Sequence, residues 1–244
     1  MTILIPALER DGGYRDLQVL LASLAAYAPG VPVIVAYKGR QEPQGGIRAI
    51  PQPPDARHYG DACRALLGAL RPTDDLLLFC NDDTVWTPDT LRLLRFDLQI
   101  IEQTGAKRGL VGLRTNICPF AAQNIRWTPA HDQERSAYTY TFEHKIAKVK
   151  SIFGIAFAVR QAVIREAPDD WMQLHWYSDN LLAYDLGQRG YAHYVSRAYV
   201  HHHGSKSGGN PLVWEREAHD WLNAHRPDYM AHLKTVGGGW AGDT

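Results

Sequence analysis

The sequence has few cysteines, no excess of charge of either sign and no long apolar run. Its three cysteines, Cys63, Cys80 and Cys118, form no CxxC pair, which excludes a disulfide framework and is typical of a reducing compartment. Basic and acidic side chains number 26 each, so the chain lacks the global positive field that draws proteins to nucleic acid or anionic membranes. No stretch approaches the ~20 apolar residues of a membrane span, and residues 1–6 lack the flanks of a signal peptide. We therefore expect a soluble, cytoplasmic protein.

The apolar residues make up 45% of the 244 residues, enough for a large core, and their order predicts how that core is built. Short apolar runs of strand type alternate three times with stripes of apolar residues at helical spacing. The runs are residues 2–5, 31–36 and 76–80, and the stripes are residues 17–24, 63–70 and 91–101. This alternation predicts a Rossmann-like, doubly wound α/β fold. Such a fold has a mostly parallel sheet, helices on both faces and a ligand crevice beyond the carboxyl ends of the strands.

The second half of the chain is less regular. A strand at residues 110–113 precedes a polar, aromatic and poorly periodic segment that extends to about residue 150. Further strands are predicted at residues 152–159 and 192–200, and further helices at 160–167, at 178–189 with Gly190 as its cap, and from residue 210. We therefore divide the chain into residues 1–106, 107–210 and 211–244, and we expect the first two parts to share one sheet.

Asn81, Asp82 and Asp83 directly follow the predicted strand at residues 76–80, so we expect them in the crevice. Carboxylates crowded at one strand end repel each other, and a cation or solvent normally relieves this repulsion. Mg²⁺ and Mn²⁺ favour oxygen ligands and keep much of their shell for phosphate and water. The cluster therefore predicts a divalent metal with a diphosphate partner. The alternative is an exposed Asx-rich turn with a capping role.

Three consecutive histidines follow the predicted strand at residues 192–200. If the strand continues, His201 and His203 face one side and His202 faces the other, and we assign His201 and His203 to the metal. A polar turn is equally compatible with this pattern. In the loop that follows, Lys206 is available to neutralise phosphate charge, although the GxxxxGK[ST] spacing of a P-loop is absent.

Asp179 stands at the start of the predicted helix at residues 178–189. An acid at this position can simply complement the helix dipole. Alternatively, it can act as a general base if its carboxylate reaches an acceptor hydroxyl. Nearby aromatic residues could stack on a sugar or a nucleobase, although such residues more often belong to a core. These residues are Trp127, Tyr138, Tyr140, Trp176 and Tyr177.

Seven segments carry a resemblance to a known family. In chain order they are PALER (6–10), HYGDA (58–62), LLFCNDDT (77–84), SIFGIAFAVR (151–160), YSDN (177–180), DLGQRGY (185–191) and VHHHGSKS (200–207). Together they resemble the inverting GT-A glycosyltransferases that are often called family 2. LLFCNDDT is the most specific segment, because it is similar to the Asp-x-Asp strand end of that family in its Asn-x-Asp form.

The resemblance implies a role for each matching position. Asp83 would bind the metal, Asn81 would face the ribose or the metal shell, and Asp82 would be the variable middle residue. Asp179 would be the catalytic base, and a histidine of the triplet would complete the metal site. The residues implied or assigned in contact with the donor are Pro6, Leu8, Glu9, His58, Asp61, Arg64, Asn81, Asp82 and Lys206.

We therefore predict a metal-dependent inverting glycosyltransferase of GT-A type that uses Mn²⁺ or Mg²⁺ and a nucleotide-diphosphate sugar such as a UDP-sugar. Residues 1–106 would bind the donor, and residues 107–210 would bind the acceptor and carry the catalytic base. The acceptor hydroxyl would belong to a glycan, a polymer or a modified nucleobase in DNA. Residues 35–38 hold no acid of the kind with which the family often binds uracil, which leaves the donor base open. The alternatives are a nucleotidyltransferase acting on sugar phosphates and a catalytically silent carbohydrate-binding relative.

Overall fold

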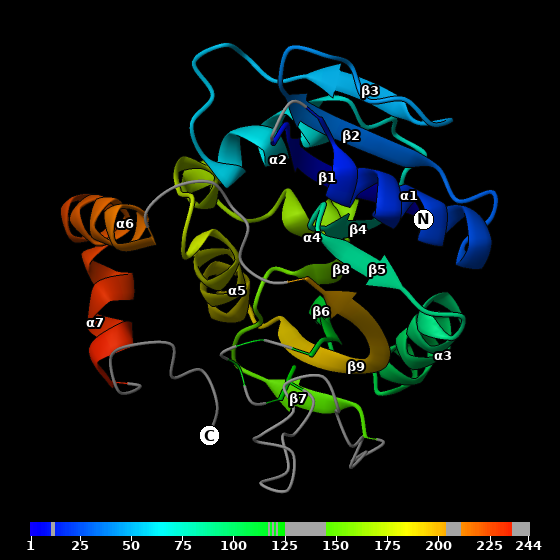
Figure 1. The fold of residues 1–244 in the computed structure, drawn as a ribbon. Coiled ribbons are helices and arrows are strands. Elements are labelled where there is room, and N and C mark those ends of the chain that lie inside the picture. The colour runs from blue at the N-terminus through cyan, green and yellow to red at the C-terminus, as the bar shows by residue number, and fades with distance from the viewer. Residues whose placement is uncertain are drawn as a thin grey trace, which may run out of the picture.

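The computed structural model describes residues 1–10, 13–116, 118, 120, 122–124, 145–203 and 211–235. The predictions made for Lys206, Trp127, Tyr138 and Tyr140 fall outside these residues. The described part of the chain forms a nine-stranded sheet with helices on both sides (Figure 1).

The first half of the chain alternates strands and helices. Its elements are β1 (Thr2–Leu8), α1 (Arg15–Tyr27), β2 (Val33–Lys38), β3 (Arg48–Pro51), α2 (Tyr59–Gly68), β4 (Leu76–Cys80), β5 (Thr84–Trp86) and α3 (Thr90–Gln103). The rest of the chain adds β6 (Arg108–Arg114), β7 (Ala147–Val149), β8 (Ala156–Arg160), α4 (Gln161–Ile164), η2 (Asp169–Gln173), α5 (Ser178–Gln188), β9 (Ala192–His202), α6 (Pro211–His225) and α7 (Pro227–Thr235).

The strand order in the sheet is β3-β2-β1-β4-β8-β6-β9-β5, and β7 also pairs with β9. β1, β2, β3, β4, β6 and β9 run in one direction, and β5, β7 and β8 run against them. The predicted α/β class with a mostly parallel sheet is therefore confirmed. The sheet takes strands from residues 1–106 and from residues 107–210 alike.

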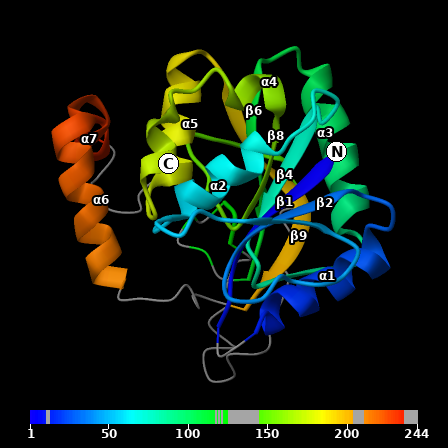
Figure 2. The same cartoon turned by 90° about the horizontal axis from the view of Figure 1, so that it is seen from above.

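Side-chain alternation along the central strands explains why both faces of the sheet carry helices. Ile3 and Ile5 of β1 belong to one buried core and Leu4 to the other. α1 and α3 cover the first face, whereas α2, α4 and α5 cover the second, with α6 and α7 beyond α5 (Figure 2). Burying apolar surface on both faces is what a parallel sheet requires. None of the described helices combines the length and apolarity needed to cross a bilayer.

Several elements differ in extent from the prediction. β1 and β2 continue to Leu8 and Lys38, β8 begins only at Ala156, and α4 ends at Ile164. β3, β5 and β7 were not predicted. They are three or four residues long, too short for side-chain alternation to be visible in the sequence.

Candidate active site

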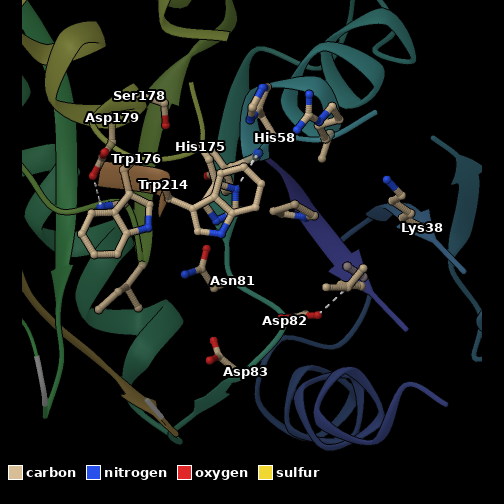
Figure 3. A pocket seen from close by; sticks show the side chains of 18 of the residues that line it. Lys38, His58, Asn81, Asp82, Asp83, His175, Trp176, Ser178, Asp179 and Trp214 are labelled. Carbon is tan, nitrogen blue, oxygen red and sulfur yellow. Dashed lines mark hydrogen bonds between the residues drawn. The ribbon is translucent and has the colours of Figure 1, made fainter. Parts of the chain in front are cut away.

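A cavity of about 660 Å³ lies at the carboxyl ends of β1 and β4, where a doubly wound sheet places its ligands. Figure 3 shows Asp179 and Trp176 at one side, Lys38 at the other, and Asn81 and Asp82 between them. The lining residues are Pro6, Ala7, Leu8, Arg10, Lys38, Gln52, Ala56, Arg57, His58, Tyr59, Ala62, Asn81, Asp82, Asp83, Phe153, Gly154, Ile155, His175, Trp176, Tyr177, Ser178, Asp179, His202 and Trp214.

The turn after β4 holds the acidic residues in a fixed place. The N–H of Asn81 donates to the carbonyl of Ile155 at 2.9 Å, and the Thr84 hydroxyl donates to the carbonyl of Asn81 at 2.9 Å. Asp82 and Asp83 are only 6% and 4% exposed. The cluster is therefore a buried, strand-anchored feature, and an exposed Asx turn does not describe it.

Both carboxylate oxygens of Asp82 accept hydrogen bonds from residues at or just after the end of β1. Its Oδ2 accepts from the N–H of Leu8 at 3.1 Å, and its Oδ1 accepts from Nη2 of Arg10 at 3.1 Å. Burial raises the pKa of Asp82 to about 6, and the charge of Arg10 and the Leu8 N–H limit this rise. Asp82 thereby ties the end of β1 to the end of β4.

Asp83 is paired with an imidazole. Its Oδ1 lies 3.2 Å from Nε2 of His202. Burial acts to raise the pKa of Asp83, but the hydrogen bond and charge of His202 outweigh it, so that the pKa is lowered. The backbone of His202 is held in turn by Asn116, which accepts from its N–H at 2.7 Å and donates to its carbonyl at 2.9 Å. The two strand ends thus present a carboxylate and an imidazole together.

The structure places a different histidine beside Asp83 than the sequence predicted. The rings of His201 and His203 do share one side, with 5.5 Å between their centroids, and neither residue lines the cavity. Nδ1 of His201 lies 3.1 Å from the Tyr199 hydroxyl, and Nδ1 of His203 lies 3.8 Å from a carboxylate oxygen of Asp16. The antiparallel pairing of β5 with β9 sets Thr84 opposite His202 and decides which side of β9 faces the cavity. The alternation was predicted correctly, but the orientation of the strand depends on a pairing with the short, unpredicted β5.

Asp179 lies in the first turn of α5, and its side chain is partly buried. The N–H of Gly154 donates to its Oδ2. A Cβ at position 154 would lie 2.9 Å from that oxygen, so only glycine lets the backbone come this close. Burial raises the pKa of Asp179 to about 6, although the backbone N–H groups of Gly154, Asp179 and Asn180 lower it.

Tyr177, directly before α5, has a left-handed backbone with a φ of 66°. This conformation is strained for a residue with a side chain, at a cost of ~1–3 kcal/mol, and it persists where the surroundings hold it. Tyr177 is buried, and its hydroxyl lies 3.1 Å from Nε2 of His219 on α6. Contacts with α6 therefore hold the turn from which Asp179 enters α5.

Pro6, Leu8, His58, Asn81 and Asp82, which the sequence assigned to the donor, all line the cavity. The family resemblance implied Pro6, Leu8 and His58, whereas Asn81 and Asp82 were also expected in the crevice because they follow a predicted strand.

Glu9, Asp61 and Arg64 were assigned to the donor as well, but none of them lines the cavity. Glu9 accepts from the backbone N–H of Arg40. Asp61 accepts from the backbone N–H of His58 at 3.0 Å at the start of α2, and it pairs with Arg64 at 3.0 Å. Asp61 and Arg64 are engaged in a helix cap and an ion pair, and Glu9 in a backbone hydrogen bond. A motif match does not distinguish such local roles from ligand binding.

Two lining residues carry no signal in the sequence. Nζ of Lys38 donates to the carbonyl of Ala56 at the far side of the cavity. Trp214 stacks on His175 with 4.4 Å between ring centroids and meets His58 edge-on at 5.6 Å. Its position at helical spacing indicates only an apolar helix face, and the tertiary fold alone brings α6 to the cavity.

No protein family and no curated protein matches this sequence, but solved structures match its fold. S. aureus TarS 1-349 in complex with UDP-GlcNAc is 13% identical, with a TM-score of 0.52 over 87% of this chain and 60% of that chain. The same protein in complex with UDP is 13% identical, with a TM-score of 0.50 over 92% and 71% of the two chains. A 4-diphosphocytidyl-2C-methyl-D-erythritol synthase from Anaerococcus prevotii is 13% identical, with a TM-score of 0.47 over 91% and 97%.

The fold is of the GT-A type. This confirms the predicted architecture, while membership of the inverting family stays a prediction. At 13% identity, the likeness to TarS concerns the fold alone. The chain spans 59% of TarS 1-349 and 43% of a longer TarS structure.

Proposed function

We propose that this protein is a metal-dependent inverting glycosyltransferase that moves a sugar from a UDP-sugar to an acceptor hydroxyl. The observation that carries the proposal is the placement of Asp83 and Asp179, from distant parts of the chain, around one cavity at the carboxyl ends of the strands. The structures of TarS with UDP-GlcNAc and with UDP, which share the GT-A fold, support this class of donor.

The groups around Asp83 fit a divalent cation that is shared with a diphosphate. Among the residues that the structure describes, no three His, Cys, Asp or Glu side chains form a complete metal site. Asp83 and His202 offer one oxygen and one nitrogen donor, and the buried Nδ1 of His202 has no partner in that part of the chain. Such a set suits Mn²⁺ or Mg²⁺, which complete their shells with phosphate and water. When bound, the cation would supply positive charge beside the leaving diphosphate.

The charge of the cavity lining also supports a cation. The charged lining side chains are Arg10, Lys38, Arg57, Asp82, Asp83 and Asp179. Apart from His202, three cations and three carboxylates therefore balance before any ligand enters. A diphosphate adds negative charge that this lining cannot offset, and a divalent cation would restore the balance.

Asp179 is proposed as the general base. An ordinary carboxylate is a weak base, whereas a pKa of about 6 brings Asp179 closer to the range that suits proton transfer. As the acceptor oxygen forms its bond to the anomeric carbon, Asp179 takes the hydroxyl proton. The bond from that carbon to the diphosphate oxygen breaks at the same time, and the diphosphate keeps the electron pair. One displacement of this kind inverts the anomeric centre.

The proposal is tested with UDP-GlcNAc and Mn²⁺ in two assays. Isothermal titration measures the binding of UDP with and without metal, and a coupled assay measures slow release of UDP by hydrolysis. We expect Mn²⁺ to strengthen UDP binding and UDP to be released over time. Release of pyrophosphate from a nucleoside triphosphate would instead favour the nucleotidyltransferase.

The variant Asp179→Asn separates the transferase from a silent binding protein. It should bind UDP as the wild type does and lose UDP release. Full UDP release by this variant would remove Asp179 from the role of base, and wild-type protein that binds UDP-GlcNAc without turnover would favour the binding protein. Lys145→Gln serves as a matched control, because Lys145 is exposed and does not line the cavity.

A further inference from the structure

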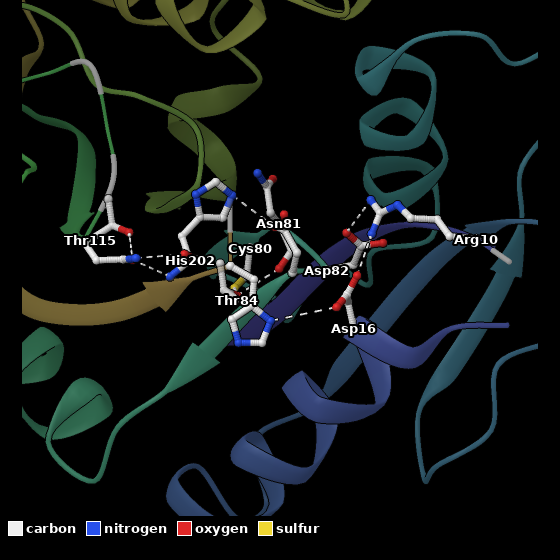
Figure 4. A network of polar contacts seen from close by, with 11 residues as sticks. Arg10, Asp16, Cys80, Asn81, Asp82, Thr84, Thr115 and His202 are labelled. Carbon is white, nitrogen blue, oxygen red and sulfur yellow. Dashed lines mark hydrogen bonds and ion pairs between the residues drawn. The ribbon is translucent and has the colours of Figure 1, made fainter. Parts of the chain in front are cut away.

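Arg10 stands between two carboxylates at the end of β1. Its Nη1 donates to Oδ2 of Asp16 at 3.3 Å, and its Nη2 donates to Oδ1 of Asp82 at 3.1 Å (Figure 4). The guanidinium therefore lies at the acidic side of the cavity, next to the predicted diphosphate position.

The backbone of Arg10 is fixed as well. Its N–H donates to the carbonyl of Gly13 at 2.8 Å, and the N–H of Gly13 donates back at 2.9 Å. The side chain lines the cavity and is 23% exposed, so that a ligand can reach it. Its Nε is buried without a hydrogen-bond partner among the described residues. A guanidinium has five N–H donors, and the two carboxylates do not use all of them.

Arg10 forms an ion pair with Asp82, which precedes Asp83 directly in the chain. Burial raises the pKa of Asp82, and the charge of Arg10 limits that rise; the same charge adds to the effect of His202 in lowering the pKa of Asp83. The other cations of the lining are placed differently, because Lys38 donates to the carbonyl of Ala56 and Arg57 is exposed. Arg10 is therefore the lining cation that adjoins the acidic cluster.

We propose that Arg10 is an anion clamp that binds the diphosphate of the nucleotide donor. This inference rests on the proposed function, and it assigns the diphosphate to a side chain to which no role had been given. The planar fork of a guanidinium matches phosphate oxygens, and hydrogen bonds between two charged groups are about twice as strong as neutral ones. Asp82 and Asp16 hold the fork in place before the ligand arrives, which lowers the ordering cost of binding.

The competing interpretation is that Arg10 only ties Asp82 to α1. The two roles predict different losses of affinity when Arg10 is substituted, because only a clamp makes the loss depend on how many phosphates the ligand carries. A tether supports the whole site, so its loss weakens every ligand equally. A clamp acts on phosphate, so its loss weakens UDP, weakens UMP less and leaves uridine unchanged.

The experiment is isothermal titration of wild type, Arg10→Gln and Arg10→Lys with UDP, UMP and uridine. Each titration is run in EDTA and again with Mn²⁺, so that the variants can also be compared if nucleotide binding requires metal. For Arg10→Gln we expect UDP affinity to fall by about 10-fold to 100-fold, the size of a lost charge-assisted contact. Uridine affinity should change by less than about twofold. Arg10→Lys keeps the charge without the fork, so its UDP affinity should lie between those of the wild type and Arg10→Gln.

Equal losses for UDP and uridine would overturn the clamp while leaving the proposed function intact. Wild-type protein that binds neither UDP nor UDP-GlcNAc under either condition would overturn the proposed function, and the clamp with it. Arg92→Gln is the matched control, because Arg92 is exposed and forms its ion pair with Asp89 outside the cavity. Circular dichroism and thermal unfolding of each variant verify that the fold is retained.

Discussion

The two sides of the cavity hold their carboxylates in different ways. At the end of β4, Asp83 is paired with the imidazole of His202, and its pKa is lowered. At the start of α5, Asp179 is held by backbone N–H groups, and burial raises its pKa to about 6. The same residue type is thus tuned in opposite directions by its neighbours.

This difference matches two different tasks. A carboxylate that stays ionised over a wide pH range is suited to attract a cation. A carboxylate with a pKa closer to neutrality is suited to take up a proton. If the comparison is correct, substitutions on the two sides must have different consequences for binding, stability and pH dependence.

The largest effect is expected from removing one carboxylate on each side. Asp179→Asn should lower the rate of transfer or donor hydrolysis by about 10²-fold to 10⁴-fold, the range of general base catalysis, and leave UDP affinity unchanged. Asp83→Asn should abolish the increase in UDP affinity caused by Mn²⁺. Titration and UDP-release assays on both variants measure this. The comparison fails if Asp179→Asn loses UDP binding or Asp83→Asn keeps its response to metal.

The two variants should also change stability in opposite directions. The folded-state pKa of Asp179 is raised, so its contribution to stability is present below its ordinary pKa of 3.8 and is lost as pH rises through about 6. At pH 7.5, Asp179→Asn should therefore raise the free energy of unfolding by ~1–3 kcal/mol, a gain that disappears below about pH 4. The pKa of Asp83 is lowered, so its contribution is present above its ordinary pKa and Asp83→Asn should destabilise. Urea unfolding at pH 7.5 and below about pH 4 measures these changes in the free energy of unfolding. Changes of the same sign in the two variants at pH 7.5 would contradict the prediction.

A smaller effect concerns the pH dependence of turnover. Because the base must be ionised, the rate at saturating donor should fall about tenfold per pH unit below about pH 6. Asp82 also has a pKa raised to about 6, so Asp82→Asn is the control. The fall in rate at low pH should persist in Asp82→Asn if Asp179 is the group that titrates. Loss of this fall would instead identify Asp82, at the end of β4, as the titrating group.

The sequence predicted the sheet and the position of the acids because both depend on local order. Apolar runs and helical stripes alternate along the chain, and Asp82 and Asp83 follow a strand directly. The choice of histidine could not be predicted, since it depends on the pairing of β9 with β5, which has three residues and no pattern of its own.

The remaining features of the site are tertiary. The left-handed backbone of Tyr177 has no signal in the sequence, because glycine is the residue that marks such a conformation. Trp214 shows only helical spacing, although it reaches the cavity. Arg10 belongs to the segment PALER, which resembles the family, but its proposed role as a clamp follows from its contacts with Asp16 and Asp82.

The smallest predicted effect tests how closely the backbone positions Asp179. Gly154→Ala places a Cβ 2.9 Å from the Asp179 carboxylate, which must shift away from the Gly154 N–H. We expect the rate to fall by roughly threefold to tenfold with unchanged UDP affinity, because a small displacement of a base costs rate without affecting the donor side. Gly68→Ala is the matched control, since nothing lies within 4 Å of its added Cβ and alanine favours the helix. Equal rates for the two variants would mean that the close approach of Gly154 does not position the base.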